Sequence, residues 1–237
     1  MVIEDTAPCA IAMRDVRFDW PGGQFGLDVP AFDVKQNETV LLLGQSGSGK
    51  STLLSLICGI LAPSQGVIQV SGTDIGTLGR AKRDRFRADH IGIIFQMFNL
   101  LPYASALDNI LVPLRFSKAR RARVQSPRQE ALALTRALGL PDALVARAQA
   151  STLSVGQQQR VAVARAMIGR PNVVIADEPT SALDSGAQEE FLELVFGQVR
   201  DAGAALLMVS HDERLASRFD RVIRLDQIAR QRRAAAS

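Results

Sequence analysis

The residues from Gly44 to Ser51, Gly-Gln-Ser-Gly-Ser-Gly-Lys-Ser, fit the pattern G-x-x-x-x-G-K-[ST], and this match restricts the fold more than any other feature. A continuous apolar run at 39–43 precedes the segment, and apolar residues at helical spacing follow from Lys50. A strand, a glycine-rich turn and a helix in this order direct backbone N–H groups and the positive end of a helix dipole at one anion. The segment therefore predicts a phosphate-binding loop in an α/β fold.

Each residue type in this loop has a physical role. Glycine allows the tight turn and the close approach of the backbone to phosphate oxygens. Lys50 is expected to neutralise the β- and γ-phosphates, and the Ser51 hydroxyl is expected to coordinate Mg²⁺. The residues predicted to contact the nucleotide here are Gly44, Gln45, Ser46, Gly47, Ser48, Gly49, Lys50, Ser51 and Thr52.

An acidic pair is the second motif of the sequence. Asp177 and Glu178 come directly after the apolar run at 173–176, which is a predicted buried strand. Asp177 is placed to hold the metal ion through its hydration shell. Glu178 is placed to orient or deprotonate an attacking water molecule. An acidic pair at a strand end is a weak signal alone, but together with the phosphate loop it predicts a hydrolytic site.

The order of predicted elements indicates a mainly parallel sheet with packed helices, interrupted by an inserted helical subdomain. We expect one domain over residues 1–237, with a core of 1–96 and 171–237 and a helical subdomain of about 97–170. The expected strands are 11–18, 27–34, 39–43, 67–70, 91–95, 173–176, 205–209 and 221–225. The expected helices begin near 50, 80, 106, 127, 157, 187 and 213.

Length and apolar content are consistent with a single substantial core, since the chain has 237 residues and 47% hydrophobic content. The longest apolar runs fall far short of the roughly 20 residues that cross a bilayer. The first residues, Met1 to Asp5, lack the features of a secretory signal, so a cytoplasmic location is expected. Cys9 and Cys58 show neither disulfide nor zinc-site spacing.

The net charge is +4, and basic residues cluster at 80–87, 118–123 and 230–233. Such clusters could meet nucleic acid or anionic lipid headgroups. No aromatic residues are interleaved with them, as binding to single-stranded nucleic acid would favour. We therefore interpret them as solvated helix faces and a frayed basic tail, and we expect no nucleic-acid partner.

Together with these segments, Leu153-Ser154-Val155-Gly156-Gln157 closely resembles the signature motif, LSGGQ, of the ATP-binding cassette family. The resemblance extends from about residue 13 to 225 and implies an ATPase that binds ATP and Mg²⁺. It also implies an antiparallel β subdomain at the N-terminal end of an α/β cassette fold. It also implies that two cassettes pack head to tail, so that the signature of each closes over nucleotide held by the other. Ser154, Gly156 and Gln157 would then present a helix N-terminus, begun after Gly156, to the γ-phosphate of the partner's nucleotide.

Other positions match further landmarks of that family. Gln96 corresponds to the glutamine that touches Mg²⁺ or water and the membrane partner, and His211 to the switch histidine that contacts the γ-phosphate. The segment Ser181-Ala182-Leu183-Asp184 corresponds to the loop that links the two active sites. Trp20 falls where the family keeps an aromatic ring against adenine, although it could simply pack a hairpin.

Val155 departs from the family pattern, which has glycine there. A β-branched residue does not easily adopt a positive φ, and its methyl groups would crowd a backbone that approaches phosphate. Either closure of the dimer is altered, or the Val155 side chain points outward. Because Ser154, Gly156 and Gln157 remain, hydrolysis is expected to survive.

The residues around Gln96, Ile-Ile-Phe-Gln-Met-Phe-Asn-Leu-Leu-Pro at 93–102, resemble the branch that serves macrolide exporters, lipoprotein-release complexes and cell division. This implies a cassette, with a homodimeric partner cassette, that drives a separate membrane permease from the inner face of the cell membrane. The alternative is a cassette ATPase with a non-transport role in cell-division mechanotransmission or linked to DNA or ribosomes. A phosphate-loop GTPase or kinase is disfavoured, because no N-K-x-D guanine motif is present.

Overall fold

The computed structural model describes residues 9–22, 25–181 and 183–233. The chain divides into two compact units, one of Met1–Asp84 with Ala205–Ser237 and the other of Arg85–Ala204. The single domain with a helical subdomain at about 97–170, predicted from the sequence, stays a prediction. The two units are described in turn.

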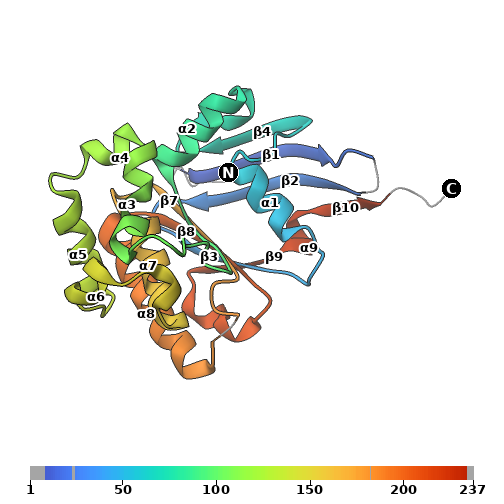
Figure 1. Cartoon of the computed structure of the whole chain (residues 1–237). Helices are drawn as coiled ribbons and strands as arrows, with labels where there is room; N and C mark the ends of the chain where they lie inside the picture. Colours follow the sequence, from blue (N-terminus) through green and yellow to red (C-terminus); the bar gives the residue numbers. More distant parts are fainter. Residues whose placement is uncertain (1–8, 23–24, 182, 234–237) are drawn as a thin grey trace, which may run out of the picture. The chain divides into compact units, whose positions relative to one another are not determined.

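The first unit contains an antiparallel sheet whose strand order is β10-β2-β1-β4-β5 (Figure 1). Its two long strands alternate apolar residues on the buried face with polar residues on the other, which is the pattern expected for a half-buried sheet. Ile11, Met13, Val16 and Phe18 form the buried row of β1. The strands are β1 (Cys9–Asp19), β2 (Phe25–Lys35), β4 (Gln65–Val70), β5 (Thr73–Asp74) and β10 (Arg230–Arg233).

The same unit contains three parallel strands, with β3 paired to β8 on one side and to β9 on the other. Residues 40–43 of β3 and all of β8 are buried, because a parallel strand covered on both faces needs apolar side chains on both. The bounds are β3 (Thr39–Leu43), α1 (Lys50–Ile57), η1 (Ile75–Thr77), β8 (Ala205–Ser210), η3 (Glu213–Arg218), β9 (Arg221–Arg224) and α9 (Leu225–Ile228).

Helix α2 (Arg80–His90) leads from the first unit into the second, and none of its residues is buried, in agreement with the predicted solvated basic face. The second unit pairs β6 with β7 in parallel and is otherwise helical. Helix α7 is at its centre, in contact with α3, α5, α8 and β6. The elements are β6 (Ile91–Ile94), α3 (Ala106–Phe116), α4 (Lys118–Ala122), α5 (Pro127–Ala137), α6 (Asp142–Arg147), η2 (Ala150–Thr152), α7 (Val155–Met167), β7 (Val173–Asp177) and α8 (Ser185–Ala202).

The prediction of a solvated helix face at 118–123 is wrong for Arg120, which is only 2% exposed. Its Nε donates to the carbonyl oxygen of Ile168 at 2.8 Å, and its Nη2 donates to that of Ala166 at 2.7 Å. These carbonyls lie at the C-terminal end of α7, where no helical N–H is available to them and a positive charge offsets the helix dipole. Burial lowers the pKa of Arg120 to about 10, so the guanidinium stays protonated at neutral pH.

The prediction of a frayed basic tail at 230–233 is also wrong. These residues form β10, which pairs antiparallel with β2. The Arg232 guanidinium lies 2.7 Å from an Asp19 carboxylate oxygen and 2.8 Å from one of Asp28. Backbone pairing and these carboxylates together offset the loss of chain entropy and the concentration of positive charge.

Candidate functional site

The phosphate loop joins the buried end of β3 to the start of α1. Its conformation depends on glycine at two positions, since Gly47 has φ of 75° and Gly49, the residue before α1, has φ of 100°. Both values lie where residues with a side chain are strained. At Gly44 the reason is space, because an added Cβ would lie 2.8 Å from the Ser48 Oγ. The predicted strand, turn and helix are therefore present, and the loop between strand and helix is a tight turn.

Lys50 is the first residue of α1 and is 7% exposed. Its ammonium donates to the carbonyl oxygens of Gly44 at 2.6 Å and Gln45 at 3.1 Å, so the charge lies against the loop. Thr52 is also buried, whereas Ser51 is exposed beside it. The cation thus lies within the loop where a phosphate chain would need it.

Ser48 provides a direct check on whether this loop fits an anion. Its Oγ is shielded from solvent and, among the described residues, has no hydrogen-bond partner. Buried hydroxyl groups are normally paired, because leaving one unpaired costs about 1–3 kcal/mol. A hydroxyl without a partner inside a glycine-rich loop, next to a buried ammonium, is the donor set that phosphate oxygens satisfy.

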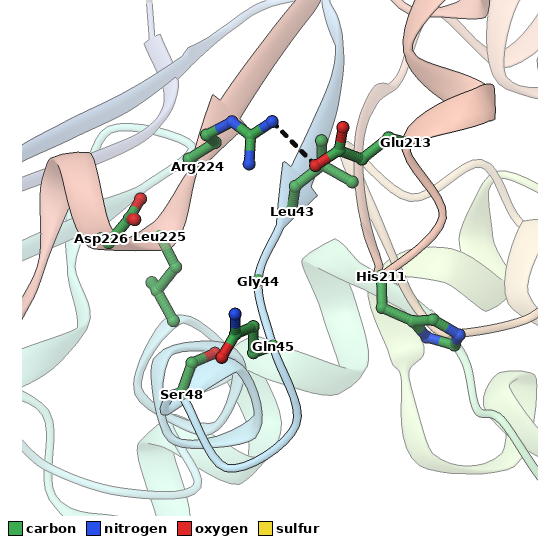
Figure 2. Close-up of a pocket in the computed structure, with 9 residues that line it drawn as sticks. All are labelled: Leu43, Gly44, Gln45, Ser48, His211, Glu213, Arg224, Leu225 and Asp226. Atoms are coloured by element: carbon green, nitrogen blue, oxygen red, sulfur yellow. Dashed lines mark hydrogen bonds and ion pairs between the residues drawn. The ribbon is translucent and has the colours of Figure 1, made fainter.

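A cavity of about 330 Å³ opens beside the loop within the first unit, and Figure 2 shows the side chains around it. Gly44, Gln45 and Ser48 line it from the loop, and His211 lines it from the segment after β8. An ion pair of 2.8 Å between Arg224 and Glu213 also borders it. The structure thus brings His211 to the same cavity as the phosphate loop, and its predicted contact with the γ-phosphate stays a prediction.

Trp20 directly follows β1, in the hairpin that joins β1 to β2. Its ring is 42% exposed and meets Phe18 edge to face, with ring centroids 5.4 Å apart. Its backbone N–H donates to the Phe25 carbonyl oxygen at 2.9 Å. The indole therefore packs on Phe18 and is partly accessible, which suits both predicted alternatives, a ring available for stacking and a hairpin packing residue.

The remaining predicted residues lie in the second unit. Asp177 is the last residue of β7, and both Asp177 and Glu178 are half-buried after four fully buried strand residues. Glu178 has φ of 44°, a left-handed conformation that is uncommon for a residue with a side chain. Strained backbone of this kind clusters at functional sites, where it fixes the direction of a side chain.

Gln96 lies in the loop after β6, and its Nε2 donates to the Ser181 Oγ at 3.3 Å. Two consecutive residues of this loop, Phe98 and Asn99, have φ of 57° and 47°. Arg165 of α7 holds them, donating to the Phe98 carbonyl oxygen at 2.5 Å and to that of Asn99 at 2.6 Å. Burial lowers the pKa of Arg165. The loop that contains Gln96 is therefore held to α7 by two hydrogen bonds.

The signature segment forms the start of α7, but one detail of the prediction is wrong. The helix begins at Val155 rather than after Gly156, because Ser154 and Gln157 form a capping box. The Gln157 N–H donates to the Ser154 Oγ at 3.3 Å, and the Ser154 N–H donates to the Gln157 Oε1 at 3.0 Å. The Ser154 hydroxyl accepts in this arrangement, so its own hydrogen remains available to another acceptor.

Val155 is the first residue of the helix and is 54% exposed, so of the two alternatives the structure favours the outward side chain. A helical backbone does not strain a β-branched residue as a positive φ would.

We expect Val155→Gly to change the steady-state rate of ATP hydrolysis by less than about threefold, because only helix propensity changes. The Val155→Ala variant controls for side-chain removal. A hundredfold increase for Val155→Gly would mean that the valine obstructs the reaction.

Three residues near these sites are absent from the sequence-based prediction. Arg165 and Arg232 each occur in arginine-rich surroundings that give no signal of a specific contact, and Gln231 lies in a segment predicted to be frayed. Ala182, part of the predicted linking loop at 181–184, lies outside the described residues.

Across the parts of the chain that the structure describes, no helix has the length and apolar character needed to cross a bilayer.

A phosphate loop between a parallel strand and a helix, an acidic strand end and a capped signature helix define a nucleotide-hydrolysing cassette. The family model described as ABC transporter matches residues 27–181. The chain belongs to this family, and it is an ATP-binding, ATP-hydrolysing cassette, as the sequence predicts. The predicted fold, with antiparallel and parallel sheets and packed helices, is confirmed as well.

Individual relatives refine the placement within the family. A "Lipoprotein-releasing system ATP-binding protein LolD" from Novosphingobium aromaticivorans is 40% identical over 92% of this chain and 96% of its own length. A "Macrolide export ATP-binding/permease protein MacB" from Rhodopirellula baltica is 36% identical over 91% of this chain, which spans 31% of that longer protein. The predicted resemblance to the export and lipoprotein-release branch is confirmed.

A solved structure gives the same fold. The ATP-binding cassette MJ0796, in a dimeric post-hydrolysis state bound to ADP and Pi, has a TM-score of 0.77 with 29% sequence identity. The match covers 96% of this chain and the whole of that one.

Proposed function

We propose that the chain is the ATP-hydrolysing subunit of a bacterial transporter of the lipoprotein-release or export type and drives a separate membrane permease. The observation that carries the proposal is the phosphate loop, where the buried Lys50 ammonium lies against the carbonyl oxygens of Gly44 and Gln45 and the shielded Ser48 hydroxyl has no partner among the described residues. Similarity over nearly the full length of a lipoprotein-releasing ATP-binding protein supports the type of transporter.

In this proposal the residues of the first unit hold the nucleotide. Residues 44–52 surround the phosphates, and the Lys50 charge neutralises the β- and γ-phosphates. His211 contacts the γ-phosphate, and the partly exposed Trp20 ring stacks on adenine. Hydrogen bonds and charge fix the phosphates, and stacking selects a base.

Four further side chains are assigned to the chemical step. Oxygen ligands at Ser51, Asp177 and Gln96 are the type that Mg²⁺ prefers, and bound Mg²⁺ would neutralise negative charge on the phosphates. Glu178 accepts a proton from the attacking water or orients it. The strained backbone at Glu178 supports this role, because it fixes where the carboxylate points.

A second cassette completes the site in a head-to-tail homodimer. Ser154, Gly156 and Gln157 at the start of α7 cap the γ-phosphate bound by the partner, with the Ser154 hydroxyl as donor. The dimeric state reported for the ADP-bound and Pi-bound cassette supports this arrangement. The linking loop at 181–184 joins the two sites, and Gln96 touches this loop through Ser181.

An exposed apolar surface beside Gln96 is the docking region for the permease. Met97 is 80% exposed and Tyr103 is 75% exposed, and Leu101 between them is exposed as well. Exposed large apolar side chains gathered on one short segment favour a protein partner. The chain would then work at the inner face of the cell membrane, as a single domain whose helical subdomain of about 97–170 receives the permease, with no nucleic-acid partner.

Membrane fractionation tests this function. Co-expression with its permease should move the chain into the membrane fraction, whereas the chain alone should remain soluble. A Met97→Asp, Tyr103→Asp variant should stay soluble in both cases and still bind ATP, because the change lies outside the phosphate loop. The matched control is Val222→Asp, an exposed apolar residue elsewhere in the chain, which should behave as the wild type. Exclusive recovery with DNA or ribosomes would favour a non-transport role.

A further inference from the structure

The C-terminal strand β10 lies beside β2, so that four residues after α9 close one edge of the antiparallel sheet (Figure 1). In the register of this pairing, Arg232 is opposite Gly26. Gly26 is also opposite Asp19 in the pairing of β1 with β2. The three residues Asp19, Gly26 and Arg232 therefore form one row across three strands, and the central position has no side chain.

The missing side chain lets the two outer residues meet. The Arg232 guanidinium lies 2.7 Å from the Asp19 Oδ1, directly over Gly26. A Cβ at position 26 would lie 2.7 Å from that same oxygen and 2.9 Å from the Arg232 Nη2. Because both distances are too short for a real Cβ, a side chain at position 26 would make Asp19 or Arg232 shift from the present arrangement of the ion pair.

A charge-balanced cluster surrounds this row. Arg232 also approaches Asp28 at 2.8 Å, and Arg17 lies 3.8 Å from both Asp19 and Asp28. The Arg232 Nε and Nη2 are shielded from solvent but are not aligned for hydrogen bonds, so the contacts are close ion pairs. Shielding strengthens ion pairs relative to those in open solvent. The cluster fastens β10 to both strands of the hairpin, and Asp19 is the residue before Trp20.

The same short strand reaches the phosphate loop. The Gln231 side chain, on the other face of β10, donates from its Nε2 to the Gly47 carbonyl oxygen at 3.2 Å. The start of β2 also packs there, since a Cβ at Gly49 would lie 3.2 Å from Leu27 and 3.4 Å from Phe25. The hairpin, the phosphate loop and β10 are thus three neighbours within one unit, each in contact with the other two.

We infer that β10 is a positioning strap that holds the Trp20 hairpin at a fixed distance from the phosphate loop, with Arg232 as its principal residue. This inference rests on the proposed stacking of Trp20 on adenine. A rigid spacing between ring and loop lets one nucleotide engage both without first ordering the hairpin. The strap therefore strengthens binding of the nucleoside part of ATP and leaves binding of the phosphate chain unchanged.

The test compares ATP with inorganic tripolyphosphate, which has the phosphates but no adenine, by isothermal titration calorimetry on the whole chain with Mg²⁺. Arg232→Met should weaken ATP binding about fivefold, the scale of two partly shielded ion pairs, and should leave tripolyphosphate binding within about twofold. Trp20 is the single tryptophan, so acrylamide quenching of its fluorescence reports on the hairpin directly. Quenching without nucleotide should increase in Arg232→Met.

Three further variants separate placement from charge. Gly26→Ala retains every charge but makes the Asp19 or Arg232 side chain shift, so it should weaken ATP binding selectively as well, by less than Arg232→Met does. Arg232→Lys retains a cation and should recover part of the affinity. Arg230→Met removes the same charge from the same strand, and none of the ion pairs found among the described residues involves Arg230. It should bind both ligands as the wild type does.

The outcomes are distinguishable. Equal weakening for ATP and tripolyphosphate, or none for either, would overturn the strap while the proposed ATPase function stands. A wild-type chain that fails to bind ATP, or that binds tripolyphosphate as tightly as ATP, would contradict the proposed nucleotide site and the strap with it. Circular dichroism establishes folding for each variant, and if Arg232→Met does not fold, the Gly26→Ala comparison decides the question.

Discussion

Replacing Glu178 by glutamine is expected to lower the rate of ATP hydrolysis about a thousandfold and to change ATP affinity by less than about threefold. Glutamine has nearly the shape of glutamate, but its amide cannot accept a proton from water. Residues other than Glu178 form the phosphate loop, so ATP binding should be retained. Because the two side chains have nearly the same size and shape, folding should be preserved.

Phosphate release at saturating ATP measures this rate, and calorimetry measures the affinity. Glu189→Gln on the exposed side of α8 makes the same chemical change and should hydrolyse ATP normally. Since the nucleotide stays bound but is not consumed, the proposed head-to-tail dimer of Glu178→Gln should accumulate, with twice the monomer mass by light scattering. A normal hydrolysis rate would remove Glu178 from its assigned role.

The dimer itself has a separate test in the same samples. Only monomers of Glu178→Gln at saturating ATP would contradict a site shared by two subunits. So would full turnover by a Ser154→Ala variant, because the cap on the partner's γ-phosphate would then contribute nothing.

The second large effect concerns binding. Lys50→Met is expected to weaken ATP affinity about a hundredfold or more, since truncating one member of a buried charge pair typically costs about 2–5 kcal/mol. Methionine has a similar length without the charge, and the site is only 7% exposed, so an apolar side chain fits it. Calorimetry or Trp20 fluorescence measures the loss.

Lys82→Met provides the matched control, because Lys82 lies exposed on α2. It should bind ATP as the wild type does, although it loses the same charge. The contrast with Glu178→Gln is diagnostic, since one variant should bind without hydrolysis and the other should fail to bind. Unchanged affinity in Lys50→Met would place the phosphates away from this loop.

The phosphate loop could be predicted from the sequence because its constraints are local. A buried strand at 39–43, two glycines with positive φ and a lysine at the helix start are all contained in a dozen residues. The start of α7 was also readable, since the serine and glutamine of a capping box are three residues apart. The predicted start, after Gly156, is two residues late, because the cap formed by Ser154 lets the helix begin at Val155.

Arg120 and β10 could not be predicted because their partners are remote in the sequence. The carbonyl oxygens that bind Arg120 belong to residues 166 and 168, and they become acceptors only because α7 ends there. An Arg-Gln-Arg-Arg segment has neither the alternation nor the apolar content of a strand. Asp19 and Asp28, which make β10 stable, are some 200 residues earlier in the chain.

The contact of Arg165 with the loop after β6 determines how that loop can move. To reposition Gln96, the loop must give up two hydrogen bonds from a charged donor, each worth roughly 1.5–3 kcal/mol. A barrier of this kind gives a threshold instead of a gradual response. Displacements that keep both bonds leave Phe98 and Asn99, next to Met97, close to their present positions, and a larger rearrangement of the loop has to break them.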